Sequence, residues 1–327
     1  MKFRIKTAIS VFGVAVLGAA LFLLSSPRKE TTKIVAPKIE TPPSAKMAAP
    51  PAEPKIADPR IESIGLSAKG RKIQSYTFGN GNNLLVFIGG IHGGYEWNSV
   101  ILAYELIDYL DQNRESIPKK LTVTVIPSLN PDGVFKTIRK EGRFTVSDVS
   151  AGSNEEGRLN ANGVDLNRNF GCNWKAQAVW KGNEVSGGKA AFSEPESAAL
   201  KQFVLSNNPA AVIFWHSQSN TIYGSQCGHD MLPETVSLMN AYSKASGYKT
   251  AETFTQYEVT GDATDWLASI DIPAMTVELA THNTIELDRN LAGVKAIFKY
   301  FEKSGFKNQS LYFGRLVLES AINKYRR

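Results

Sequence analysis

The sequence predicts an α/β layered domain with a largely parallel sheet, formed by residues 61–327. The first observation is that short β-branched runs, typical of strands, alternate with longer segments of helical periodicity. The second is a content of 43% hydrophobic residues, which is enough for one sizeable core in a chain of this length. Intrinsic disorder and a small disulfide-stapled fold are therefore excluded.

The net charge of +6 comes from the N-terminal part of the chain. Residues 1–60 carry ten Lys or Arg and four Asp or Glu, which leaves 27 of each sign in residues 61–327. A formally neutral domain is not built to neutralise nucleic-acid phosphates, so we expect no nucleic-acid partner.

Residues 1–26 are predicted to be a transmembrane signal anchor. Three basic residues precede an uncharged run whose apolar centre extends from Ala8 to Leu24. The residues that follow form a poor cleavage site, which favours an anchor over a removed signal peptide. Because the basic residues should stay in the cytoplasm, the rest of the chain would be extracytoplasmic, on the periplasmic or cell-surface side. Inner-membrane lipid would then be a partner, whereas cleavage would give a secreted protein.

Residues 27–60 contain eight of the 15 prolines of the chain. Such a segment cannot form a core, and we expect a disordered tether. The folded domain would then begin near Ile61.

Within the domain, four apolar runs are predicted to be strands: Leu84–Ile88, Leu121–Ile126, Ala211–Trp215 and Ala274–Leu279. Helices are expected at Asn98–Asp111, Ala198–Leu205, Leu291–Phe301 and Leu316–Tyr325. Ser193 and Glu196 are interpreted as a capping box, with Pro195 in the first turn. Residues 139–162, 217–231 and 280–290 are predicted loops, and the last two follow strands, where ligand sites of open α/β sheets lie.

Two of the four histidines directly follow predicted strands, and one of them has a carboxylate nearby. His92 is followed by Glu96 four residues later, and His216 ends the third strand run. Two imidazoles and one carboxylate are the ligands of a catalytic zinc site with one open position. Nitrogen ligands favour Zn²⁺ over Ca²⁺ or Mg²⁺, so we expect one zinc ion. The alternative for Glu96 is a favourable charge at a helix N-terminus.

Glu278 is an acidic residue within an apolar strand run, where a charge is costly unless it has a function. A hydrolytic zinc site needs a carboxylate that is not itself a ligand to act as general base. Glu278 is the candidate, and a paired core carboxylate is the alternative.

The ordered motifs IHGGYE, NPDG, RLNANGVDLNRNF, WHSQS, YEVTGDATDW and TVEL resemble the zinc metallocarboxypeptidases, the carboxypeptidase A-like family, in its bacterial branch. The resemblance covers residues 80–300. It implies an α/β/α sandwich around a mixed, mostly parallel eight-stranded sheet, with one zinc at the strand ends. It also implies a peptide substrate with a free C-terminal carboxylate.

The resemblance assigns roles to residues that match the family motifs. His92, Glu96 and His216 match the zinc ligands, and Glu278 matches the general base. Arg158 matches the arginine that polarises the scissile carbonyl, although Arg139 and Arg143 precede it in the same loop. The remaining matches line the substrate pocket: Asn167 and Arg168 for the terminal carboxylate, Tyr257 as the capping tyrosine, and Thr264 and Asp262 for the side chain.

The sequence departs from the family at one point, because three residues separate His92 from Glu96 where two are usual. Gly93 and Gly94 provide the backbone freedom to absorb the extra residue, and we expect a local bulge rather than a lost site. Elsewhere, His282 is a candidate partner close to the site, and His229 is expected at the surface.

The two cysteines, Cys172 and Cys227, each follow one of these motifs. In an oxidising extracytoplasmic space an even pair is best interpreted as one disulfide, with two buried free thiols as the alternative.

These observations predict a zinc carboxypeptidase that hydrolyses the C-terminal peptide bond. A zinc amidase or deacylase of the same fold, acting on peptidoglycan stem peptides or acyl-amino acids, is the nearer alternative. A non-catalytic binding module is the more distant one. A small or polar pocket at Thr264 and Asp262 would suit a cationic side chain or diaminopimelate.

Overall fold

The computed structural model describes residues 59–149 and 155–304. The predicted anchor, the predicted tether up to residue 58 and the predicted helix at 316–325 lie outside the described residues. Arg60 begins the first strand, one residue before the expected start of the domain. Among the described helices, none combines the length and the apolar composition needed to cross a membrane.

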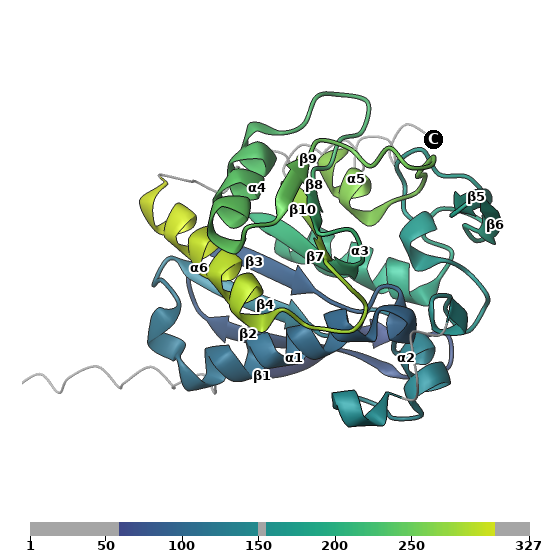
Figure 1. Ribbon diagram of the computed structural model, residues 1–327, viewed down its shortest axis with the longest axis horizontal. Coiled ribbons are helices and arrows are strands. Elements are labelled where there is room, and N and C mark those ends of the chain that lie inside the picture. The colour runs from purple at the N-terminus through teal and green to yellow at the C-terminus, as the bar shows by residue number, and fades with distance from the viewer. Residues whose placement is uncertain (1–58, 150–154, 305–327) are drawn as a thin grey trace, which may run out of the picture. The chain divides into compact units, whose positions relative to one another are not determined.

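The main sheet of the described part has eight strands in the order β1-β2-β4-β3-β7-β10-β8-β9 (Figure 1). Their bounds are Arg60–Leu66 (β1), Lys72–Gly79 (β2), Asn83–Ile88 (β3), Leu121–Ile126 (β4), Ala211–Ser217 (β7), Thr221–Tyr223 (β8), Lys249–Ala251 (β9) and Ala274–Leu279 (β10). β4, β3, β7 and β10 run parallel, and β8 and β9 are parallel to each other. β1, β2 and β8 make the antiparallel pairings. The mixed, mostly parallel sheet is thus confirmed.

The four predicted strands are the four central parallel ones. Central parallel strands are covered on both faces, so they appear as continuous apolar runs, and every residue of β7 is buried. The strands toward the two edges were not predicted. β1 and β2 mix polar with apolar residues, and β8 and β9 have only three residues each.

Helices pack on both faces of this sheet, which confirms the three-layer arrangement. The α-helices of the described part are Trp97–Gln112 (α1), Pro131–Ile138 (α2), Pro195–Asn207 (α3), Pro233–Ser246 (α4), Ala263–Ala268 (α5) and Leu287–Lys303 (α6). One hydrophobic core joins α1, α4 and α6 to the sheet through residues such as Leu106, Tyr242 and Phe298. A second core joins α3 and α5 through Leu200, Leu267 and their neighbours.

The predicted helices in the described part are present, but the capping box at α3 is wrong. Glu194 is the N-cap residue of α3, with no side-chain capping hydrogen bond. The Glu196 carboxylate instead accepts hydrogen bonds from the Ala68 backbone N–H at 2.9 Å and from Asn160 Nδ2 at 3.1 Å. The capping pattern does not form because two segments distant in sequence each provide a hydrogen-bond donor to this carboxylate.

A hairpin outside the main sheet was also not predicted. Gln177–Trp180 (β5) and Asn183–Ser186 (β6) form a separate two-stranded sheet. Val164 bridges Ser186, and the Asp165 backbone N–H donates to the Ser186 carbonyl at 2.9 Å. The hairpin is therefore fastened to the loop that carries the VDLNRNF motif.

Candidate active site and metal centre

Three adjacent parallel strands position the central groups of the site. β3 leads through two glycines and Ile91 to His92, while His216 lies near the end of β7 and Glu278 near the end of β10. β7 pairs with both β3 and β10, and Glu278 is in register with His216. Because parallel strands end at one edge of a sheet, side chains far apart in sequence converge here.

The extra residue between His92 and Glu96 is accommodated in a turn of 3₁₀ helix, Gly93–Glu96, which leads into α1. Gly93 has φ +48°, and a Cβ at this position would lie 2.6 Å from the Gly157 carbonyl oxygen. Glycine is therefore required for both its conformation and its small size. His92 and Glu96 still meet, with 2.7 Å between Nδ1 and Oε1.

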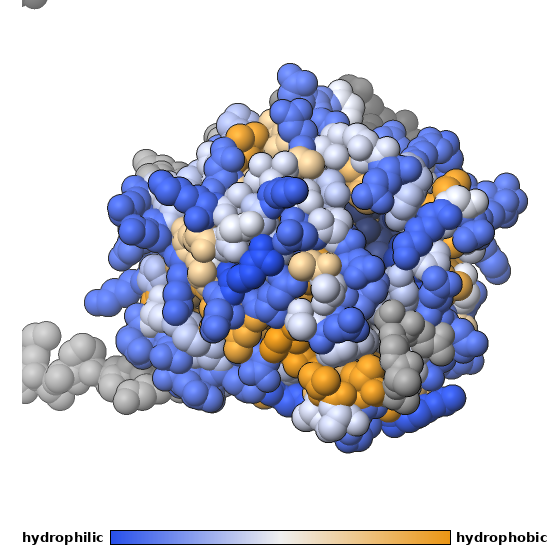
Figure 2. All heavy atoms as spheres, in the orientation of Figure 1, coloured by the Kyte–Doolittle hydropathy of each residue, from blue (hydrophilic) through white to orange (hydrophobic). Residues whose placement is uncertain are grey.

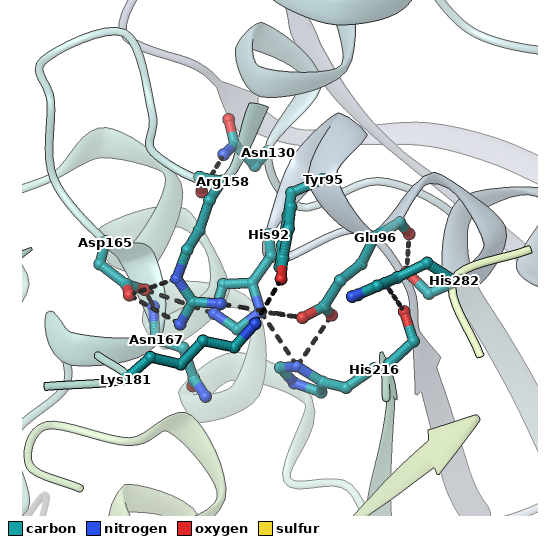
Figure 3. Close-up of polar contacts among 12 residues, drawn as sticks. His92, Tyr95, Glu96, Asn130, Arg158, Asp165, Asn167, Lys181, His216 and His282 are labelled. Atoms are coloured by element: carbon teal, nitrogen blue, oxygen red, sulfur yellow. Dashed lines mark hydrogen bonds and ion pairs between the residues drawn. The ribbon is translucent and has the colours of Figure 1, made fainter. Parts of the chain in front are cut away.

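His92, Glu96 and His216 converge as a candidate metal site (Figure 3). His216 Nδ1 lies 3.1 Å from Glu96 Oε2 and 3.2 Å from His92 Nδ1. All three residues are buried, with ligand atoms within 4.8 Å of one another. Burial alone would raise the pKa of Glu96, but the two histidines hold that pKa below its usual range.

These side chains fit a zinc ion. Within the described residues, Glu96 Oε2 and His92 Nε2 are buried and form no hydrogen bond of good geometry, although His216 Nδ1 and Asp165 Oδ1 lie 3.1 and 3.4 Å away, so the cluster is incompletely satisfied by these residues. His92 Nδ1 and His216 Nδ1 face the Glu96 carboxylate and each other, and with deprotonated nitrogens this arrangement offers lone pairs from all three side chains to one cation. The same set is the His₂Glu donor set of catalytic zinc sites.

Asp165 supports this cluster and was not identified from the sequence. Its side chain is fully buried, and Oδ1 lies 3.4 Å from His92 Nε2. Arg158 donates to Oδ2 from Nε at 2.9 Å. Burial would raise the pKa of Asp165, yet Arg158 holds that pKa well below its usual range. An acidic residue two positions before Asn167, inside the VDLNRNF motif, was the available signal.

Of the three arginines considered for the carbonyl-polarising role, Arg158 is the one at the site. Its Nη1 lies 3.8 Å from Glu96 Oε1, and its guanidinium is 4.5 Å from the Trp180 ring centroid. Arg143 forms two hydrogen bonds of 2.7 Å with Asp108 on α1. Arg139 is the C-cap residue of α2.

Glu278 lines the same cavity as the three candidate ligands. Burial raises its pKa to about 7, with the neighbouring His216 opposing the shift. A carboxyl group that titrates near neutrality can both accept and return a proton.

Asn167 and Arg168 lie together on another part of the cavity wall. Arg168 is buried and donates to carbonyl oxygens, from Nη1 to Asn167 at 2.7 Å and from Nη2 to Val179 at 3.3 Å. Within residues 59–149 and 155–304, no carboxylate forms an ion pair with Arg168. An oriented guanidinium with donors to spare is suited to binding a ligand carboxylate.

Asp262 and Thr264 both line the cavity, but Asp262 has a structural role that was not predicted. It is the N-cap of α5 and accepts from the Thr264 backbone N–H at 2.7 Å and the Thr264 hydroxyl at 2.6 Å. Asn167 Nδ2 donates to its other oxygen at 2.7 Å. Asp265 also lines the cavity, and burial with the nearby Asp262 raises the Asp265 pKa to about 7.

The candidate capping tyrosine, Tyr257, lies in the loop before α5 and lines the cavity. Its ring packs edge-on against Phe254, with centroids 4.7 Å apart. Desolvation by burial raises the pKa of Tyr257, so its hydroxyl is protonated at neutral pH.

The other predicted contacts near the site are present. Cys172 and Cys227 form a disulfide, which confirms that prediction and ties the loop after Arg168 to the loop after β8. Ser217 Oγ lies 2.7 Å from His282 Nδ1, so His282 is linked to the residue after His216. His229 is exposed, as expected, at the outer part of the cavity.

These residues surround a cavity of about 860 Å³. The space-filling view is hollowed on the side of the β5–β6 hairpin, with hydrophilic side chains around the opening (Figure 2). A cavity of this size accepts a ligand of a few residues rather than a folded protein.

Comparison with known proteins identifies the family. A family model described as zinc carboxypeptidase matches residues 53–299. The chain belongs to the zinc carboxypeptidase family. Membership of this family implies zinc at the His92, Glu96 and His216 cluster.

The names of two relatives state different substrates. The chain is 27% identical over 244 residues to a γ-D-glutamyl-L-diamino acid endopeptidase of Lysinibacillus sphaericus, a match that covers 67% of this chain and 60% of that protein. It is 33% identical over 131 residues to murein peptide amidase A of Escherichia coli, covering 37% of this chain and 50% of that protein. Among solved structures, thrombin-activatable fibrinolysis inhibitor superposes with a TM-score of 0.62 at 20% identity, covering 76% and 70% of the two chains. The structural likeness concerns the fold alone.

Proposed function

We propose that this protein is a zinc-dependent peptidase that hydrolyses the amide bond before a C-terminal residue with a free carboxylate. One observation carries the proposal. The three candidate ligands, the half-buried Glu278 and Arg168 all line a single cavity. This combination supports cleavage next to a bound carboxylate.

Zinc bound by His92, Glu96 and His216 would polarise the scissile carbonyl and acidify a water molecule. Glu278 takes the proton from the attacking water and delivers it to the nitrogen of the leaving amine. A pKa near 7 suits both transfers, because neither protonation state is strongly disfavoured at neutral pH.

Arg158, oriented by Asp165, donates a hydrogen bond to the carbonyl oxygen as negative charge develops there. Arg168 and the free N–H of Asn167 Nδ2 bind the terminal carboxylate. Tyr257 covers the terminal residue and excludes water. These contacts make cleavage depend on a free C-terminus.

For the substrate class, we propose cell-wall stem peptides, cleaved by an amidase or peptidase reaction, in preference to general peptides. Asp262 and Asp265 line the cavity beside α5 and favour a leaving residue with a cationic side chain, as in a diamino acid. The names of the Lysinibacillus and E. coli relatives point to the same chemistry. The disulfide favours an extracytoplasmic location, where such peptides occur.

The experiment that tests this function uses the zinc-loaded full chain, a peptide set that differs in the last residue, and the variant Glu278→Gln. We expect hydrolysis by the unmodified protein and a loss of at least about 100-fold in kcat for the variant, with zinc content unchanged. Glu258→Gln is the matched control, since Glu258 also lines the cavity but pairs with Lys175 at 2.7 Å. Zinc binding without hydrolysis of any peptide would favour the non-catalytic alternative.

A further inference from the structure

The β5–β6 hairpin places a lysine at the wall of the cavity. Lys181 is at the hairpin tip, directly after Trp180, which is buried against Tyr95 with ring centroids 5.4 Å apart. Lys181 Nζ donates to the Tyr95 hydroxyl at 3.0 Å (Figure 3). The ammonium lies 4.9 Å from the centroid of the Trp180 ring, so the aromatic pair positions it through one hydrogen bond and a cation–π contact.

Lys181 has no acidic partner in residues 59–149 and 155–304. Arg158 pairs with Asp165, and Arg168, held by two carbonyl oxygens, is already assigned to the terminal carboxylate. Lys175, another lysine of this segment, pairs with Glu258 of the cavity lining. An oriented ammonium in a cavity wall, without an internal carboxylate, is a candidate anion-binding group.

The side-chain contacts of Lys181 lie on the Tyr95 side of the cavity, whereas the proposed pocket for the side chain of the leaving residue lies at α5. Tyr95 immediately precedes Glu96, and its ring lies against His282, 4.7 Å between centroids. The carboxylates of Asp262 and Asp265 instead belong to α5. The cavity is therefore polarised, with acidic groups at α5 and a cation at the hairpin.

We propose that Lys181 is a specificity-determining residue that binds a substrate carboxylate on the acyl side of the scissile bond. The inference rests on the proposed function. A γ-linked glutamyl residue carries a free α-carboxylate on that side, whereas an α-linked residue of an ordinary peptide has none. Lys181 thus selects for γ-glutamyl linkage, while Arg168 takes the terminal carboxylate.

The test compares two peptides, γ-D-glutamyl-L-lysine with its glutamyl α-carboxylate free and the same peptide with that group amidated. Binding to zinc-loaded full-length Glu278→Gln protein is measured by calorimetry, and hydrolysis is measured with Glu278 intact. We expect Lys181→Met to weaken binding and kcat/KM for the acidic peptide about tenfold and to leave the amide unchanged. Lys181→Arg should restore most of the loss.

Lys201→Met is the matched control, because Lys201 also lies over an aromatic ring, that of Phe192, but does not line the cavity. Equal binding of the two peptides, or an equal loss for both in Lys181→Met, would overturn the proposal. A loss that appears only when the leaving residue is diaminopimelate would overturn the acyl-side placement. Tighter binding of the acidic peptide without any hydrolysis would retain the role of Lys181 and refute the proposed function instead.

Discussion

Removal of the Cys172–Cys227 disulfide gives the most quantitative test of how the cavity is stabilised. The bond joins residues 55 positions apart. Closing a loop of this length in the unfolded chain lowers its entropy by an amount equivalent to about 4 kcal/mol at 25 °C. The variant in which both cysteines are alanine should lose about that free energy of unfolding. Its dependence on urea should steepen as well, because an unlinked chain exposes more surface.

Urea titration followed by tryptophan fluorescence measures both quantities, and reduced, alkylated unmodified protein should behave like the double variant. Zinc content in the native state should not change, since neither cysteine belongs to the candidate metal site. A loss below about 1 kcal/mol, with an unaltered urea dependence, would refute the reasoning that the bond acts by restricting the unfolded chain.

Three further predictions address the site. Asp165→Asn should destabilise the protein by about 3–5 kcal/mol, because it leaves the buried Arg158 without its partner, and should weaken zinc affinity about 10–100-fold in a chelator competition. Asp265 has a pKa of about 7 in the folded protein against 3.8 ordinarily, so the native state binds the extra proton. Its contribution to the free energy of unfolding is complete below pH 4 and is lost as pH rises through 7. Asp265→Asn should remove this pH dependence, which amounts to on the order of a few kcal/mol, in denaturation experiments across that pH range. Gly261→Ala should cost more stability than Gly163→Ala, since both have positive φ but only at Gly261 does a Cβ meet a backbone atom, Arg168 O at 2.3 Å. Equal thermal shifts for the two would contradict this.

The central strands and the polar groups at their ends were predictable, because each signal is local. A buried parallel strand is a continuous apolar run, and a histidine or glutamate at its end stands out against that run. The bonded cysteines could be expected because an even pair followed two motifs. The α1 and α6 periodicities were equally clear.

Other features depend on contacts between distant segments and left little trace in the sequence. The three-residue strands β8 and β9 are too short to give a sequence signal, and they form because neighbouring strands of the sheet provide their hydrogen-bond partners. Glu196 has a capping pattern but bonds to Asn160 and Ala68 instead. The sequence around Lys181 is that of an ordinary turn. Its position in the cavity wall depends on the contact with Tyr95, which is distant in sequence.

The division between the central sheet and the β5–β6 hairpin has an evolutionary consequence. The candidate metal ligands and Glu278 depend on three adjacent strands whose register cannot shift without dispersing them. The hairpin is outside that ladder and contacts the site through side chains, through the Val179 carbonyl that accepts from Arg168, and through one short bridge. Its length and tip residue can therefore change while the hydrolytic groups stay in place. A grafted hairpin from another family member is accordingly a direct route to an enzyme with altered linkage preference.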